Sequence, residues 1–192
     1  MRIAIVDESP ARAAVIREGL EGTGLAELLV LSERAGLVAR LEAFAPDVVL
    51  MDLANPQRDE LEELFAVSRA LARPVAMFVD QSDDAAMESA IDAGVSAYVV
   101  DGLKAERIRP IVELAIKRFN AFARLKSELD EARNALAERK AVDAAKALLM
   151  KKRGLDEATA YAQLRKAAMD SGRRISEVAD ALLTADKLMG GL

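Results

Sequence analysis

Three carboxylates follow short apolar runs and are the side chains best placed to do chemistry. Asp7 and Glu8 come directly after the run Arg2–Val6, and Asp52 follows the run Asp47–Met51. Grouped carboxylate oxygens suit Mg²⁺, and a carboxylate can also accept a phosphoryl group. Acids at strand ends equally serve to cap helices and to solubilise loops, so the spacing alone leaves both interpretations open.

The composition removes several other kinds of chemistry. The chain has 192 residues, of which 52% are hydrophobic and 31% charged, and it contains neither Cys nor His. This excludes disulfides, thiol catalysis, imidazole bases and the usual zinc sites. The sequence has no Gly-rich phosphate loop, and no apolar run approaches the roughly 18 residues of a membrane span. We therefore expect a cytoplasmic protein of one or two domains that is not an enzyme.

The first half of the sequence alternates apolar runs with amphipathic stretches. The runs start roughly 20–27 residues apart, as repeating strand–helix units require, and they are continuously apolar, which is typical of a parallel sheet covered on both faces. The sequence thus predicts a five-stranded, doubly wound α/β sheet of the flavodoxin-like kind, with any site at the carboxyl ends of its strands. The predicted strands are Arg2–Val6, Glu27–Leu31, Asp47–Met51, Pro74–Val79 and Ala97–Val100.

Two segments of this half, VDES at 6–9 and VVLMD at 48–52, resemble the receiver domain of bacterial response regulators. The resemblance covers residues 1–120. It implies Asp52 as the phosphoacceptor position. It also implies Asp7 and Glu8, together with Asp52, as the ligands of a Mg²⁺ ion.

Two positions depart from the receiver pattern. Receivers carry Thr or Ser at the end of the fourth strand, where this chain has Val79, and Lys at the end of the fifth, where it has Asp101. A negative charge in place of that Lys disfavours a phosphoaspartate in an acidic pocket. We therefore expect a pseudo-receiver that works as a binding module, with Asp52 unused and no cofactor other than Mg²⁺ in the acidic pocket.

Residues 104–139 predict one long helix that overlaps the last receiver helix. They contain no Gly, and apolar residues recur every seven positions, which is the heptad period of a coiled coil. We expect this stripe to hold a homodimer, either a constitutive one or one that forms on RNA. The alternative is a stripe that folds back on the same chain. The stripe consists of Ile108, Ala115, Phe122, Leu129 and Leu136.

The C-terminal segment, residues 137–192, predicts a small domain of three short helices. The first ends near Arg153, Asp156 caps the second, and the third starts at Ser176. Residues 130–192 carry 12 Lys/Arg against 10 Asp/Glu, whereas residues 1–129 carry 15 against 22. This asymmetry indicates two modules with different partners.

The run from Glu138 to Leu183 resembles the ANTAR domain, the RNA-binding module of antiterminators of the AmiR and NasT type. The match extends over about 45 residues without a gap. The matching elements are Arg139, the Ala145-Lys146-Ala147-x-Leu149-Met150 run, Ala160, Leu164-Arg165, Ala168-Met169 and Ile175-x-x-Val178-Ala179.

The resemblance implies a function. Such proteins bind leader RNA with two hexanucleotide-loop stem-loops and prevent a terminator from forming, and a nitrate-sensing partner of NasS type controls the NasT members. We expect nitrate or nitrite assimilation genes as the target, and no stacking of bases on aromatic side chains, because aromatic residues are few. A phosphorylated response regulator with the same RNA output is the alternative. The expected RNA-binding residues are Arg139, Lys140, Ala144, Lys146, Ala147, Met150, Arg165, Ala168 and Met169.

Overall fold

The computed structural model of the chain describes residues 1–21, 27–54 and 58–190. Its strands form one parallel sheet in the order β2-β1-β3-β4-β5, which is the flavodoxin-like order. The predicted doubly wound, five-stranded sheet is thus confirmed. The strands are β1 (Arg2–Val6), β2 (Glu27–Leu31), β3 (Val48–Leu53), β4 (Val75–Val79) and β5 (Ala97–Val100).

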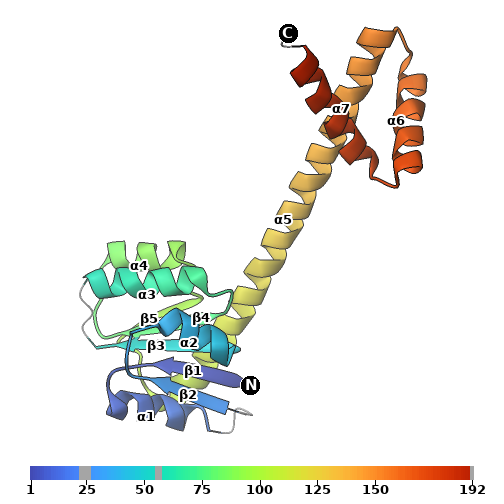
Figure 1. Cartoon of the computed structure of the whole chain (residues 1–192). Helices are drawn as coiled ribbons and strands as arrows, with labels where there is room; N and C mark the ends of the chain where they lie inside the picture. The colour runs from blue at the N-terminus through green and yellow to red at the C-terminus, as the bar shows by residue number, and fades with distance from the viewer. Residues whose placement is uncertain (22–26, 55–57, 191–192) are drawn as a thin grey trace. The chain divides into compact units, whose positions relative to one another are not determined.

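Helices cover both faces of this sheet (Figure 1). One face packs against α1 and the first turns of α5, through Ile16, Ile108 and Val112. The other face packs against α2, α3 and α4, where Leu41 and Leu64 are fully enclosed. Because both faces are buried, the central strands are apolar except for Arg2 at the start of β1 and Asp52 near the end of β3. The helices are α1 (Pro10–Gly19), α2 (Leu37–Phe44), α3 (Arg58–Ala70) and α4 (Asp84–Asp92).

The long helix α5 runs from Ala105 to Arg153 without a break, over 49 residues. No separate helix begins near residues 137–139, because that stretch has no Gly or Pro to interrupt α5. The first of the three predicted C-terminal helices is instead the last part of α5. The helix ends at Arg153 and is followed by Gly154, which has a φ of 65° that favours glycine.

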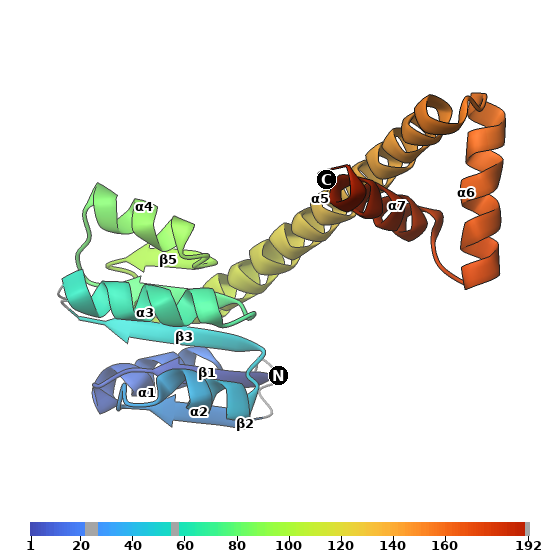
Figure 2. The same ribbon diagram turned by 45° about the horizontal axis from the view of Figure 1, so that its top comes forward.

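Two compact units divide the chain, residues 1–123 and residues 124–192. In the second unit α6 (Glu157–Ser171) and α7 (Ile175–Met189) lie beside the last turns of α5, as Figures 1 and 2 show. Their shared core contains Ala145, Leu149 and Leu164. The Asp156 side chain accepts the backbone N–H of Thr159 at 2.7 Å, which confirms it as the N-cap of α6. Among the described residues, no helix is long and apolar enough to cross a bilayer.

Candidate functional site

The acidic edge of the sheet brings together two of the three predicted carboxylates. Asp7 follows β1 and Asp52 lies inside β3, the neighbouring strand, and both are at least 95% buried. The Asp7 Oδ1 atom accepts the backbone N–H of Ser9 at 2.7 Å. The second oxygen, Oδ2, has no hydrogen-bond partner among the described residues. The edge therefore holds two enclosed acids, one of which has an unsatisfied oxygen.

A guanidinium group that the sequence reasoning missed neutralises this edge. Arg12, in the first turn of α1, donates from both Nε and Nη2 to the two oxygens of Asp52. It also donates from Nη1 and Nη2 to the two oxygens of Asp80, at 3.0 and 2.9 Å. Such two-pronged contacts are the strong form of a charge-assisted hydrogen bond. Arg12 therefore bridges Asp52, near the end of β3, and Asp80, which follows β4. These contacts raise the pKa of Arg12, and the hydrogen bonds to Asp52 contribute most.

The buried carboxyl of Asp7 titrates well above its usual range. Its pKa is raised to about 6 in total. Burial is the largest cause and the negative charge of Asp52 adds to it, whereas the Ser9 N–H and the Arg12 charge lower the pKa. The protonated form of Asp7 is consequently favoured in the folded protein under mildly acidic conditions.

The third predicted carboxylate, Glu8, is engaged elsewhere. Its side chain is 65% exposed and pairs with Arg34 at 2.9 Å, while Arg34 also pairs with Glu60 at 3.1 Å. Glu8 does line a small hollow of about 10 Å³ together with Asp7 and Asp52, but its charge is directed to Arg34. The expected convergence of three carboxylates on one cation is therefore corrected to two acids around Arg12.

A Mg²⁺ ion does not fit this arrangement. Both oxygens of Asp52 already accept hydrogen bonds from Arg12, whose positive charge occupies the space beside them. Within residues 1–21, 27–54 and 58–190, no three acids are grouped as a metal site requires. The unpartnered oxygen of Asp7 suits a cation, and Mg²⁺ in proteins is ordinarily held by one or two carboxylates with waters completing its shell. The obstacle is therefore the guanidinium of Arg12, which takes both oxygens of Asp52.

The two departures from the receiver pattern lie next to each other. Val79 is buried at the end of β4, and its carbonyl oxygen accepts the N–H of Asp101 at 2.9 Å. Asp101 is exposed and has a φ of 48°. Val79 therefore supplies no hydroxyl to Asp52, and Asp101 supplies no cation.

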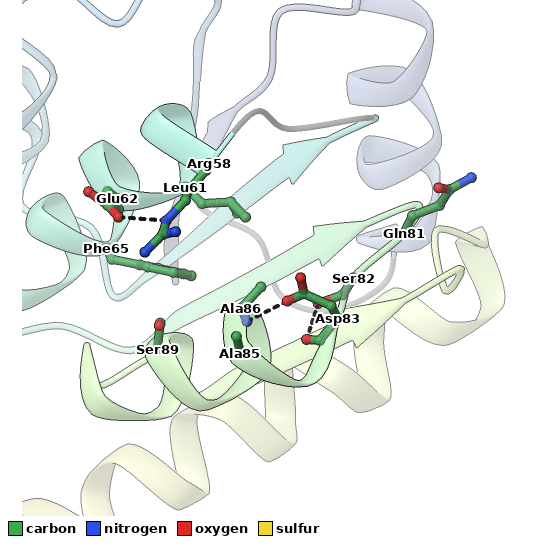
Figure 3. A pocket seen from close by; sticks show the side chains of 10 residues that line it. All are labelled: Arg58, Leu61, Glu62, Phe65, Gln81, Ser82, Asp83, Ala85, Ala86 and Ser89. Atoms are coloured by element: carbon green, nitrogen blue, oxygen red, sulfur yellow. Dashed lines mark hydrogen bonds and ion pairs between the residues drawn. The ribbon is translucent and has the colours of Figure 1, made fainter.

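A larger hollow of about 480 Å³ lies between α3 and α4 (Figure 3). Arg58 and Glu62 on its rim pair with each other at 3.2 Å, and Asp83 accepts the N–H of Ala86 at 2.7 Å as the cap of α4. Phe65 forms part of the wall. The charged groups on its rim are thus satisfied internally, and the hollow offers little unpaired charge to a ligand.

The predicted RNA-binding residues fall into an exposed set and an enclosed set. On α5, Lys140, Ala144, Ala147 and Met150 are exposed and recur every three or four residues, so they share one face. On α6, Arg165 and Met169 are exposed, whereas Ala168 is only 7% exposed. The methyl group of Ala168 is packed into the interior of the unit, so of these α6 residues it is the least accessible to RNA, and its contact with RNA stays a prediction.

Lys146 has a structural partner at each side. Its Nζ atom lies 2.8 Å from Asp143 on the same helix and 2.7 Å from Glu157 in the first turn of α6. These contacts raise the pKa of Lys146, first through the hydrogen bond to Asp143. Lys146 therefore ties α5 to α6 and is less free to contact RNA than Arg139 or Arg165, neither of which has an ion pair among the described residues.

A hollow of about 660 Å³ lies in the second unit, between α5, α6 and the start of α7. Its lining includes Arg139, Lys146 and the acids Glu138 and Asp143 from α5. Tyr161 lines it from α6, and Arg174 and Ser176 line it from the start of α7. Tyr161, Arg174 and Ser176 were not predicted. The i, i+4 spacing of Tyr161 and Arg165 on α6 is a signal that could have singled out the tyrosine.

A doubly wound sheet with enclosed acids at the ends of β1 and β3, followed by a helical unit, defines the class of response regulators with a receiver and an output domain. The family model described as Response regulator receiver domain matches residues 3–113. The ANTAR domain matches residues 130–183, so this chain belongs to the family of ANTAR-domain response regulators.

Curated relatives agree with this assignment. The chain is 32% identical to the transcriptional regulatory protein PdtaR of Mycobacterium tuberculosis, over 74% of this chain and 69% of that protein. It is 28% identical to the aliphatic amidase regulator of Pseudomonas aeruginosa, over 71% and 70% of the two chains. A nitrate regulatory protein of Klebsiella oxytoca is 36% identical, over 42% of this chain and 20% of its own length.

Solved structures show the fold of the first unit. A receiver domain protein (CheY-like) from Methanospirillum hungatei JF-1 superposes with a TM-score of 0.53 at 18% identity, over 62% of this chain and 96% of that one. The receiver domain of a modulated diguanylate cyclase from Desulfovibrio desulfuricans G20 gives a TM-score of 0.51 at 22% identity, over 62% and 96%.

Proposed function

We propose that this protein is an RNA-binding transcription antiterminator of nitrate or nitrite assimilation genes, which acts on leader RNA that carries two hexaloop hairpins. The observation that carries the proposal is the exposed face of Lys140, Ala144, Ala147 and Met150 within the segment that matches the ANTAR domain. Ala144 and Ala147 lie between Lys140 and Met150 on this face. Their small side chains allow RNA to approach the α5 backbone closely. Exposed loop bases can be recognised by their edges while the stem supplies phosphates.

The first unit serves as a binding module for a controlling protein in this proposal, which we take to be a nitrate sensor of NasS type. Arg12 already supplies the positive charge beside Asp52 that a metal ion or Lys would supply to a phosphorylated receiver. The nitrate regulatory protein among the relatives supports the choice of genes and of sensor. The proposed place of action is the cytoplasm, where leader RNA is transcribed.

RNA binding by full-length variants tests the proposal. Arg165→Ala removes an exposed α6 cation without an ion pair, so we expect weaker binding to the two-hexaloop leader and a salt dependence that is flatter by about one unit of slope. Lys146→Ala weakens binding as well, because it frees the start of α6. The control is Arg58→Ala, an exposed Arg in the first unit, which should bind as the wild type does. Equal losses at Arg58 would indicate general electrostatics and contradict a defined RNA site.

A phosphorylation-dependent regulator with the same output is the second candidate, and the buried Asp52 on β3 favours it. Treatment with acetyl phosphate and Mg²⁺, followed by intact-mass measurement, separates the two. We expect no stable phosphorylated species. A phosphorylated form that disappears in Asp52→Asn and that changes RNA affinity would favour this second candidate over control by a partner protein alone.

A further inference from the structure

The hollow of the second unit combines an aromatic ring with polar groups. Tyr161 is 45% exposed, and it is one of only two tyrosines in the chain. Ser176 is 6% exposed. Both side chains line the hollow. The Ser176 hydroxyl is not one of the fully enclosed unpartnered atoms of the described residues, which are Asp7 Oδ2 and Ser68 Oγ, so it is accessible to a ligand in the hollow.

The charges around the hollow distinguish Arg139 from its neighbours. Lys146 is held by Asp143 and Glu157, and Arg174 pairs with Glu138 at 3.4 Å. Arg139 is the lining cation that has no ion pair within the part of the chain that the structure describes. Ser176 and Ile175 open α7, and the first N–H groups of a helix have no partner within the helix itself. The Arg139 guanidinium, the Ser176 hydroxyl and these N–H groups form a set of donors suited to a phosphate, beside the acids Glu138 and Asp143 that also line the hollow.

We propose that this hollow binds one unstacked nucleotide of the RNA, with its base on the ring of Tyr161 and its phosphate held by Arg139 and Ser176. The inference rests on the proposed RNA-binding function and names a contact within it. It replaces the expectation that no base stacks on an aromatic side chain, because Tyr161 lines the hollow. Unpaired loop bases are commonly recognised by stacking on aromatic side chains. The volume of about 660 Å³ lies within the usual range of about 300–1,000 Å³ for ligand pockets.

The exposed face of α6 continues from this hollow. Tyr161, Arg165 and Met169 are spaced four residues apart and are all exposed, so they form one stripe along the helix. A strand whose nucleotide enters the hollow at Tyr161 then has Arg165 one turn further along for the next phosphate. The hollow and the predicted contact at Arg165 therefore belong to one continuous surface.

Fluorescence anisotropy with labelled two-hexaloop RNA and the full-length chain provides the test. Tyr161→Ala removes the stacking ring, so we expect a loss of affinity of about 5- to 150-fold, the range of one stacked base. Tyr161→Phe keeps the ring and should bind within a factor of about two of the wild type. Arg139→Ala should weaken binding and flatten the salt dependence by about one unit of slope. The matched control is Arg133→Ala, which changes an exposed Arg of α5 outside the hollow. It should change neither the RNA affinity nor the salt dependence.

Crosslinking on the wild type keeps the test independent of how the variants fold. RNA with 4-thiouridine at successive loop positions should crosslink, at one loop position, to the peptide that contains Tyr161. Two results would overturn this inference while the proposed function stands. One is a folded Tyr161→Ala variant that binds the RNA as tightly as the wild type, and the other is crosslinks that form only outside the hollow. A wild type that does not prefer the hexaloop RNA over a scrambled loop overturns the proposed function itself.

Discussion

The guanidinium of Arg12 lies between carboxylates from two strands, and its positive charge determines the chemistry of the acidic edge. Asp52 is wholly enclosed and Asp7 lies beside it with an unsatisfied oxygen. Without Arg12, two acids would be buried together with no counter-charge. The ion pair therefore ties the first turn of α1 to the carboxyl ends of β3 and β4.

Removal of this charge should destabilise the first unit strongly. Arg12→Met leaves Asp52 buried and unpaired, so we expect the free energy of unfolding to fall by about 3–5 kcal/mol. Hydrogen exchange of the β3 amides measures this, because they exchange only when the sheet opens. Arg58→Met, which breaks an exposed ion pair of the same kind, should cost at most about 1 kcal/mol. Similar losses for both variants would contradict an enclosed counter-ion at Arg12.

Asp7 should give the first unit a defined pH dependence. Its pKa is raised from 3.8 to about 6 in the folded protein, so the folded state holds a proton that the unfolded state has already released, and stability falls as pH rises from about 4 to about 6. Asp7→Asn removes this effect. At about pH 7.5 we expect the variant to be more stable by about 1–3 kcal/mol, and near pH 4 the two proteins should be alike. Denaturation at several pH values measures the difference, and a gain that persists unchanged at pH 4 would contradict the assignment.

The pairing of Asp7 with Asp52 could be predicted from the sequence, because the carboxyl ends of neighbouring parallel strands meet at one edge of the sheet. The roles of Arg12 and Asp80 could not. An Arg in the first turn of a helix is ordinarily solvated, and nothing in its spacing states which acids it will reach. Long side chains select partners only after the strands are placed, which is also why Glu8 was assigned to the wrong set of neighbours.

The heptad stripe of α5 changes its environment along the helix. Ile108 and Ala115 are fully buried against the sheet, whereas Phe122, Leu125, Leu129 and Leu136 are between 49% and 69% exposed. The heptad period alone did not reveal this division, because the same spacing serves both a sheet and a second helix. Exposed apolar side chains at heptad spacing favour a partner helix.

A dimer held by the exposed part of the stripe remains our prediction at this scale. Leu129→Glu combined with Leu136→Glu places charges in the proposed seam, so we expect sedimentation velocity to show a shift from dimer to monomer. Circular dichroism should report an intact first unit, because neither residue contacts the sheet. A wild type that stays monomeric at tens of micromolar, with and without RNA, would contradict the dimer.

A helix end could be predicted where a capping residue or a glycine marks it, and could not be predicted where no such residue is present. Asp156 and Gly154 marked the turn between α5 and α6 correctly, because a capping side chain and a left-handed glycine are encoded locally. The boundary near residues 137–139 was inferred from the start of a motif, and no residue there breaks a helix. A functional module can therefore begin inside a continuous helix.

The whole molecule consists of an acidic sheet unit and a helical unit with a small excess of positive charge, joined by one helix. The comparisons place it among ANTAR-domain response regulators. In the proposed mechanism, Arg12 takes the place of the phosphoryl-group chemistry of the first unit, and the exposed faces of α5 and α6 contact RNA. Control by a partner protein and a dimer built on α5 complete the proposed mechanism.

Single-round transcription in vitro tests the central claim most directly. The template carries a promoter, a leader with two adjacent hexaloop hairpins and an intrinsic terminator, and the full-length protein is added before elongation begins. The account predicts that read-through rises with protein concentration, that scrambling both hexaloops abolishes the rise, and that acetyl phosphate is not required. Termination that stays unchanged at protein concentrations that saturate the RNA, or read-through that rises equally on the scrambled template, would contradict it.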